Sequence, residues 1–163
     1  MPVTEDRNKL LALLAGNLIF LSRKYQRGMG QMAIGLDEAE RVLEGARAKA
    51  VELGIALSIA VVDEGGHLVA LKRMDGARFP TAEIARDKAL TAAGFGADTA
   101  QLAQSVGKMP AFASGIQIGA GWLRFAGGGV ALRREGQVLG GIGISGSSAE
   151  HDHECAQAGL AKL

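Results

Sequence analysis

The six residues from Glu150 to Cys155, EHDHEC, combine the side-chain types that commonly bind metal ions. On a helix, however, His151 and His153 would lie about 200° apart, so they could not both hold one ion. Acidic residues also suit the first turn of a helix, where they complement free backbone amides. We therefore predict the start of a C-terminal helix and no metal site, with a weak surface metal site as the alternative.

A lysine falls on the apolar side of the helix that we expect from Thr81 to Phe95. The buried face of this helix is expected to consist of Ile84, Ala85, Ala89, Ala92 and Phe95. Lys88 lies within that face, and an unpaired buried ammonium costs several kcal/mol. It should therefore meet a carboxylate, line a polar cavity or extend its amine to solvent, and the candidate carboxylates are Asp63, Asp75 and Asp152. The pair is either structural or part of a ligand pocket, where it could transfer a proton.

The C-terminal helix places Asp152 on its inward stripe together with Cys155. Cys155 is expected to be a small core residue, because no positively charged neighbour that would activate its thiol is recognisable.

Three other places could contribute to ligand binding. Arg73 ends an apolar run, just before Asp75, and its planar guanidinium could hold a carboxylate. Ser145 and Gly146 lead into the last helix, whose free amides could bind an anion. His67 begins a strand and is either an exposed edge histidine or a haem or metal ligand.

Glycines are concentrated at 127–129 and within the run GGIGISG at 140–146. Neither cluster is a phosphate loop, since no Lys-Ser/Thr pair follows and the second cluster lies inside a strand. A strand without side chains on one face lets a ligand or another backbone segment approach closely.

The elements that position these residues follow from hydrophobic periodicity. Residues 37–54 have helical spacing and end on a glycine. Residues 55–74 and 129–145 each contain two β-rich runs around a short glycine turn, which predicts antiparallel hairpins. A helix, a hairpin, two helices, a hairpin and a last helix predict an α+β fold of the broad α/β class, with an antiparallel sheet and helices packed against it.

Helix starts are marked by two capping pairs, Asp98 with Gln101 and Ser147 with Glu150. Between these helices, residues 110–129 are rich in glycine and weakly periodic. We expect a loop with one strand there.

Composition limits the possible classes of protein. The chain has 163 residues, of which 48% are apolar, so one ordinary core is expected. Lys and Arg number 18 against 17 Asp and Glu, which argues against nucleic acid as a partner. A single cysteine cannot form an internal disulfide and favours a reducing, cytoplasmic location. The apolar residues 10–21 are too few to span a membrane, and a signal peptide is the alternative to a packed helix.

Three stretches of the chain stand out together: SIAVVDEGGHLVALKRMDGA, KALTAA and GQVLGGIGISGSSAEHDHECAQAGL. They resemble the GlcG/HbpS-like family, which includes glycolate-operon accessory proteins, haem-binding proteins and the C-terminal domain of some corrinoid adenosyltransferases. The resemblance covers about residues 36–163, so we expect a family domain at 31–163 and a helical extension at 1–30. It implies a profilin-like central antiparallel sheet and assembly into dimers or larger homo-oligomers.

The resemblance also implies a pocket near the Arg-Met-Asp-Gly turn, formed by Arg73, Asp75, Lys88, Ser145 and Asp152. Our leading hypothesis is a small oligomeric protein that binds haem, another tetrapyrrole or a small carboxylated metabolite. The candidate binding residues are Arg73, Asp75, Lys88, Ser145, Gly146 and His67. One alternative is an enzyme of small-molecule catabolism in which Lys88 and Asp152 or Asp75 move a proton. Another is a structural assembly subunit.

Overall fold

A computed structural model describes residues 33–111 and 120–163 of the chain. Residues 33–163 form one compact unit. The helix that we predict at the N-terminus, within residues 1–30, lies outside the described residues.

Two antiparallel hairpins form a four-stranded sheet, as the sequence predicts. Their strands pair in the order β2-β1-β4-β3, so the first strand of one hairpin lies beside the second strand of the other. The strands are β1 (Ser58–Asp63), β2 (Leu68–Arg73), β3 (Gly129–Arg134) and β4 (Gln137–Ser145). The expected α+β class is confirmed.

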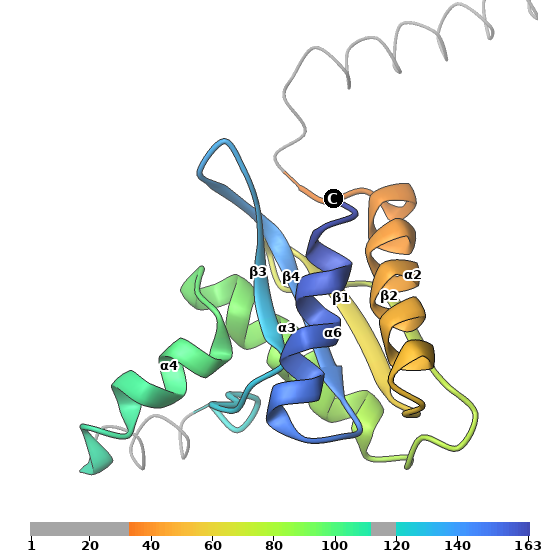
Figure 1. The fold of residues 1–163 in the computed structure, drawn as a ribbon. Coiled ribbons are helices and arrows are strands. Elements are labelled where there is room, and N and C mark those ends of the chain that lie inside the picture. Colours follow the sequence, from red (N-terminus) through yellow and green to blue (C-terminus); the bar gives the residue numbers. More distant parts are fainter. Residues whose placement is uncertain (1–32, 112–119) are drawn as a thin grey trace, which may run out of the picture. The chain divides into compact units, whose positions relative to one another are not determined.

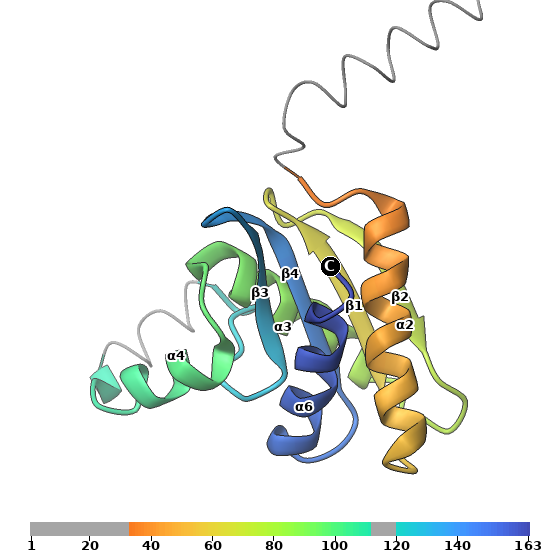
Figure 2. The same ribbon diagram turned by 45° about the horizontal axis from the view of Figure 1, so that its top comes forward.

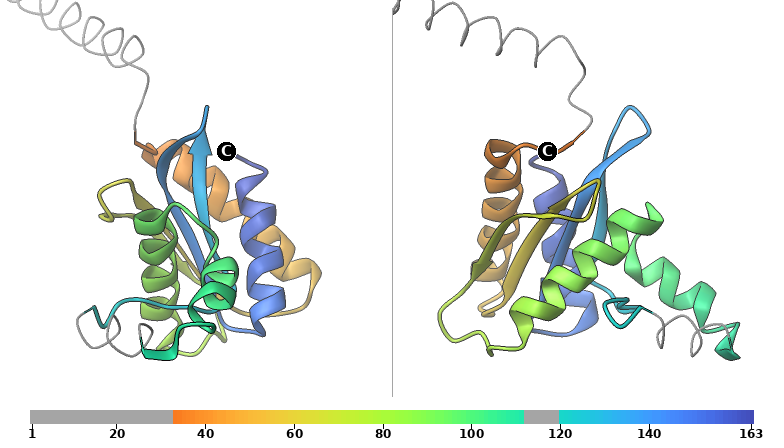
Figure 3. Two further views of the ribbon diagram at one scale, coloured as in Figure 1. Left: turned by 90° about the vertical axis from the view of Figure 1, so that its left-hand side faces the viewer. Right: turned by 180° about the vertical axis from the view of Figure 1, so that it is seen from behind.

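Helices cover both faces of this sheet. On one face α2 (Leu36–Glu52) and α6 (Ala149–Leu160) lie side by side, and on the other lies α3 (Thr81–Phe95) (Figures 1, 2 and 3). The shorter α4 (Thr99–Val106) follows α3. The larger hydrophobic core lies between the sheet and the helices α2 and α6. It contains the fully buried Leu43, Ile59 and Ile142.

The glycines of β4 let the sheet approach α3 closely. A Cβ at Gly141 or Gly143 would collide with the backbone of α3 at Ala89 or Ala85. Of the two explanations for this glycine-rich strand, close approach of another backbone segment is therefore the one that the structure shows.

Two details of helix capping differ from the prediction. Ser148, not Ser147, caps α6, and its hydroxyl accepts a hydrogen bond from the His151 amide. Asp98 does precede α4 but makes no side-chain cap, and its carboxylate accepts a hydrogen bond from Gln157. A helix start can thus be located from sequence more securely than its capping side chain.

The face of α3 and the segment before β3 also differ from expectation. Phe95 is 44% exposed and Ile84 only half-buried, whereas the polar Asp87 and Thr91 are buried. Residues 110–111 are helical and 120–128 contain no strand, so the expected strand is absent from the described part of 110–128. The remainder of that prediction, at 112–119, lies outside the described residues.

Candidate functional site

Lys88 and Asp152 form a buried ion pair. Lys88 Nζ lies 2.8 Å from Asp152 Oδ2, and the two side chains are 6% and 3% exposed. They come from α3 and α6, which lie on opposite faces of the sheet (Figures 1 and 3). Of the three carboxylates considered for Lys88, Asp152 is therefore the partner.

Hydrogen bonds satisfy both oxygens of the Asp152 carboxylate. Oδ2 accepts from Lys88, while Oδ1 accepts from the Ser147 amide at 3.1 Å. Burial raises the pKa of Asp152 above its ordinary value, and the hydrogen bonds from Lys88 and from the backbone amides of Ser147 and Gly146 oppose that rise. The carboxylate thus ties the loop before α6 to α3.

Gly128 packs against the ion pair, and its lack of a side chain leaves room for Lys88 and Asp152. Its φ of +111° suits glycine, and an added Cβ would lie 3.0 Å from Lys88 Nζ and 2.8 Å from Asp152 Cβ. The next residue is held by Thr99 at the start of α4, whose hydroxyl accepts a hydrogen bond from the Gly129 amide at 2.9 Å. The glycines at 127–129 therefore serve close packing over the pair.

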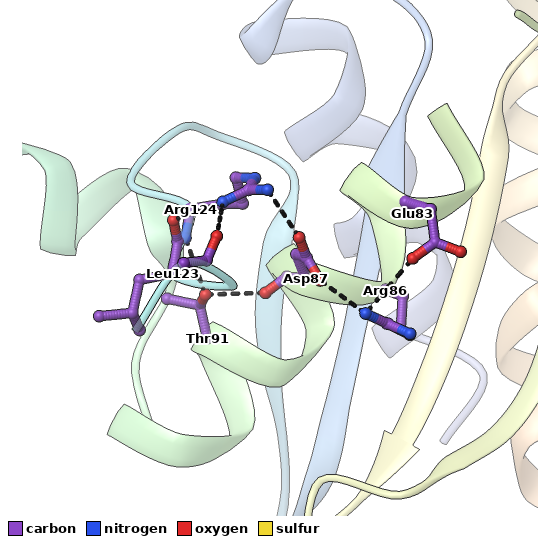
Figure 4. Close-up of polar contacts among 7 residues, drawn as sticks. Glu83, Arg86, Asp87, Thr91, Leu123 and Arg124 are labelled. Atoms are coloured by element: carbon purple, nitrogen blue, oxygen red, sulfur yellow. Dashed lines mark hydrogen bonds and ion pairs between the residues drawn. The ribbon is translucent and has the colours of Figure 1, made fainter. Parts of the chain in front are cut away.

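A second polar cluster fastens the segment 120–129, which we call the strap, to α3 (Figure 4). Asp87 binds Arg124 at 2.8 Å and Arg86 at 3.3 Å, although its side chain is only 6% exposed. Thr91 donates to the Asp87 carbonyl and accepts a hydrogen bond from the Arg124 amide at 3.0 Å. Sequence reasoning did not select these residues, and the only signal was the i, i+4 spacing of Asp87 and Thr91 on one side of α3.

Arg73 and Asp75 lie apart from the buried pair, at the turn after β2. They line an open depression of about 450 Å³ together with Arg47, Lys72 and Met74. Arg73 Nη1 donates to the carbonyl of Ala77 at 2.6 Å, which holds the guanidinium against its own turn. The residues that line this depression do not include Lys88 or Asp152, so the pocket that the resemblance implies stays a prediction.

Ser145 lies at the same end of the sheet as Arg73. Ser58 pairs with both, so Ser145 and Arg73 are two strands apart, or about 10 Å. Ser145 is only 7% exposed, and a Cβ on Gly146 would meet the backbone of Leu57. Ser145 is thus packed into the fold, while Gly146 is exposed with its backbone close to Leu57, and neither is among the residues that line the depression.

His67 lies in the turn between β1 and β2, at the opposite end of the hairpin from Arg73. Its side chain is 83% exposed, and Nδ1 lies 3.3 Å from both carboxylate oxygens of Asp63. Asp63 also accepts a hydrogen bond from the His67 amide at 2.8 Å. Because β1 has six residues, about 17 Å of strand separates the two ends of the hairpin.

The motif EHDHEC begins α6, as predicted. His151 faces the Ser147 hydroxyl at 3.2 Å, whereas His153 faces Gln157 at 3.4 Å. Within residues 33–111 and 120–163, no group of three or more histidine, cysteine and acidic side chains is placed to hold a metal ion. In the same part of the chain, no helix has the length and apolar character needed to cross a membrane.

Comparisons with known proteins agree with this fold. Residues 34–161 match the family model described as "Haem degrading protein HbpS-like". Corrinoid adenosyltransferase PduO of Citrobacter freundii is 33% identical over 132 residues, which are 81% of this chain and 39% of that protein. The chain thus spans well under half of this relative.

Solved structures extend the comparison. A complex of PduOC with heme has a TM-score of 0.74 and 31% identity, over 80% of this chain and 95% of that one. A double mutant of HbpS from Streptomyces reticuli also has a TM-score of 0.74, with 30% identity over 80% and 87% of the two chains. These matches place the α+β domain in a class that includes haem-binding proteins. The chain belongs to the HbpS-like family, which confirms the resemblance seen in its sequence.

Proposed function

We propose that this chain binds haem and that His67 would hold the iron. The observation that carries the proposal is the pairing of an exposed imidazole with a carboxylate behind it. Metal-binding histidines commonly donate one ring N–H to a carboxylate, which fixes the tautomer and leaves the other nitrogen to bind the metal. Asp63 is placed to hold Nδ1 in this way, and Nε2 would then bind the iron.

The single imidazole of His67 suits haem better than a bare metal ion. A haem iron needs only one or two ligands from the protein, because the porphyrin supplies four, and a single histidine is a common axial ligand. The complex of the related PduOC with heme supports the same ligand class. Bound haem would supply a redox-active iron, while the chain would bind it through His67 and orient the imidazole through Asp63.

The alternative of proton transfer by Lys88 and Asp152 finds less support. Both side chains are nearly inaccessible, so a substrate could not reach them in this conformation. Asp75, the other candidate partner, lines the separate depression beside Arg73. A structural role for the ion pair accounts for its burial and hydrogen bonds.

We also infer that the protein is a homo-oligomer in a reducing, cytoplasmic compartment. Large apolar side chains are exposed, such as Phe79 at 84% and Val51 at 58%, and an interface between subunits would remove such side chains from water. The single cysteine, which is free and buried, fits the compartment.

The haem proposal is tested by titrating the protein with haem and following the Soret band in the wild type and in His67→Ala.

A further inference from the structure

We propose that the depression beside the turn after β2 is a second binding site, for a small organic acid whose carboxylate is held by Arg73 and Lys72. This site is separate from the proposed haem site, because Arg73 and His67 lie at opposite ends of the β1–β2 hairpin. It is formed by the middle of α2, the end of β2 and the following turn.

Three cations line the depression, and one of them is already neutralised. Arg47 binds Glu44 through Nε at 2.9 Å and again through Nη2. Arg47 lowers the pKa of Glu44 through this hydrogen bond, so the carboxylate stays ionised and keeps Arg47 in place. Lys72 approaches Glu44 only to 3.7 Å, which is beyond hydrogen-bonding distance.

The guanidinium of Arg73 has more N–H donors than its hydrogen bond to Ala77 uses. Within the described residues, a hydrogen bond from Nη1 to the carbonyl of Ala77 orients the guanidinium, which carries five N–H groups in total. No carboxylate among the described residues forms an ion pair with Arg73. A planar guanidinium that is already oriented can bind a carboxylate through two parallel hydrogen bonds.

Size and charge define the class of ligand. The volume of about 450 Å³ is near the lower end for small-molecule sites. Arg47, Lys72 and Arg73 carry three positive charges, against two negative charges on Asp75 in the lining and on Glu44, which binds Arg47. The depression therefore has a surplus of one positive charge. That surplus suits a small carboxylate better than a polyphosphate, and Met74 offers apolar surface to a short carbon chain.

Succinate is a suitable probe, with the neutral succinamide as its matched control. Calorimetric titration of the haem-free protein at low salt should show binding of succinate and none of succinamide. Lys72→Met and Arg73→Gln should each weaken binding by about tenfold, the usual effect of losing a charged hydrogen bond. Arg41→Gln, which removes an exposed arginine elsewhere on α2, should leave binding unchanged.

The inference is overturned if succinate does not bind at about 10 mM, or if succinamide binds equally well. It is also overturned if Lys72→Met binds succinate as the wild type does. Lys72 makes only the long contact with Glu44, so this variant is expected to fold even if Arg73→Gln disturbs its turn.

Discussion

Lys88 and Asp152 join two helices that lie on opposite faces of the sheet, through a contact of 2.8 Å between side chains that are almost fully buried. Gly128 lies next to both side chains, and a Cβ there would lie 2.8 Å from Asp152 Cβ and 3.0 Å from Lys88 Nζ. A buried ion pair adds little net stability compared with apolar residues of similar size, but losing one partner leaves an uncompensated charge. The pair therefore fixes how α3 and α6 fit together more than it stabilises the fold.

Removing Lys88 alone should be costly. We expect Lys88→Met to lower the free energy of unfolding by about 3–5 kcal/mol, because the Asp152 carboxylate stays buried without its cation. The double variant Lys88→Met with Asp152→Leu should recover much of this loss in urea unfolding. Strict additivity of the two single substitutions would show that the residues are not coupled.

The loss in Lys88→Met should also depend on pH. Burial raises the folded-state pKa of Asp152 above its unfolded-state value of about 3.9, and without Lys88 it rises further. A carboxyl group with a raised folded pKa destabilises the fold as pH rises through that pKa. The deficit of Lys88→Met relative to the wild type should therefore shrink as pH falls from neutral toward about 4. A deficit that does not change over this range would contradict this description of Asp152.

Cys155 should be unreactive in the folded protein. Burial raises the pKa of its thiol to about 11, and the side chain is fully buried. Ellman's reagent at about pH 8 should therefore label Cys155 only in denaturant, since the thiolate is the reactive form. Rapid labelling of the native protein would place the thiol at the surface.

Gly128→Ala should destabilise the fold more than Gly136→Ala. Both glycines have positive φ, +111° and +84°, so both substitutions strain the backbone, by about 1–3 kcal/mol. Only Gly128 is crowded, whereas nothing lies within 4 Å of a Cβ at Gly136. Thermal unfolding should separate the two variants, and equal losses would mean that Gly128 is needed for its backbone conformation alone.

Asp87→Asn should loosen the strap. It removes the negative charge that Arg124 and Arg86 share, while the side chain keeps its size (Figure 4). We expect faster hydrogen exchange of backbone amides at 120–129 and unchanged exchange in β1 and β4. Glu83→Gln is the matched control, because Glu83 lies on the same helix and binds Arg86 but is 71% exposed. If both variants exchange alike, Asp87 does not fasten the strap.

Local patterns in the sequence predict much of this fold. The two hairpins, the inward Asp152 and the buried Lys88 follow from side-chain period and glycine turns, which depend only on neighbouring residues. The pairing of Lys88 with Asp152 could not be distinguished from pairing with Asp63 or Asp75, since it depends on how helices pack across a sheet.

The candidate site is harder to predict. Arg124 carries no signal in a weakly periodic segment, and its ion pair with Asp87 forms only when the strap lies on α3. The resemblance implied one pocket formed by Arg73, Asp75, Lys88, Ser145 and Asp152, and this stays a prediction. His67, a separate candidate, lies at the opposite end of the hairpin from Arg73. Sequence proximity to a motif says little about which end of a strand a side chain occupies.

Haem titration of His67→Ala tests the proposed function most directly. His151→Ala is the matched control, because His151 is also exposed and its Nδ1 faces the Ser147 hydroxyl. We predict a shifted Soret band in the wild type and in His151→Ala, and at least about tenfold weaker binding in His67→Ala. Asp63→Asn should give an altered spectrum or a smaller loss of affinity. A wild-type spectrum and affinity in His67→Ala would contradict the assignment of this histidine to the iron.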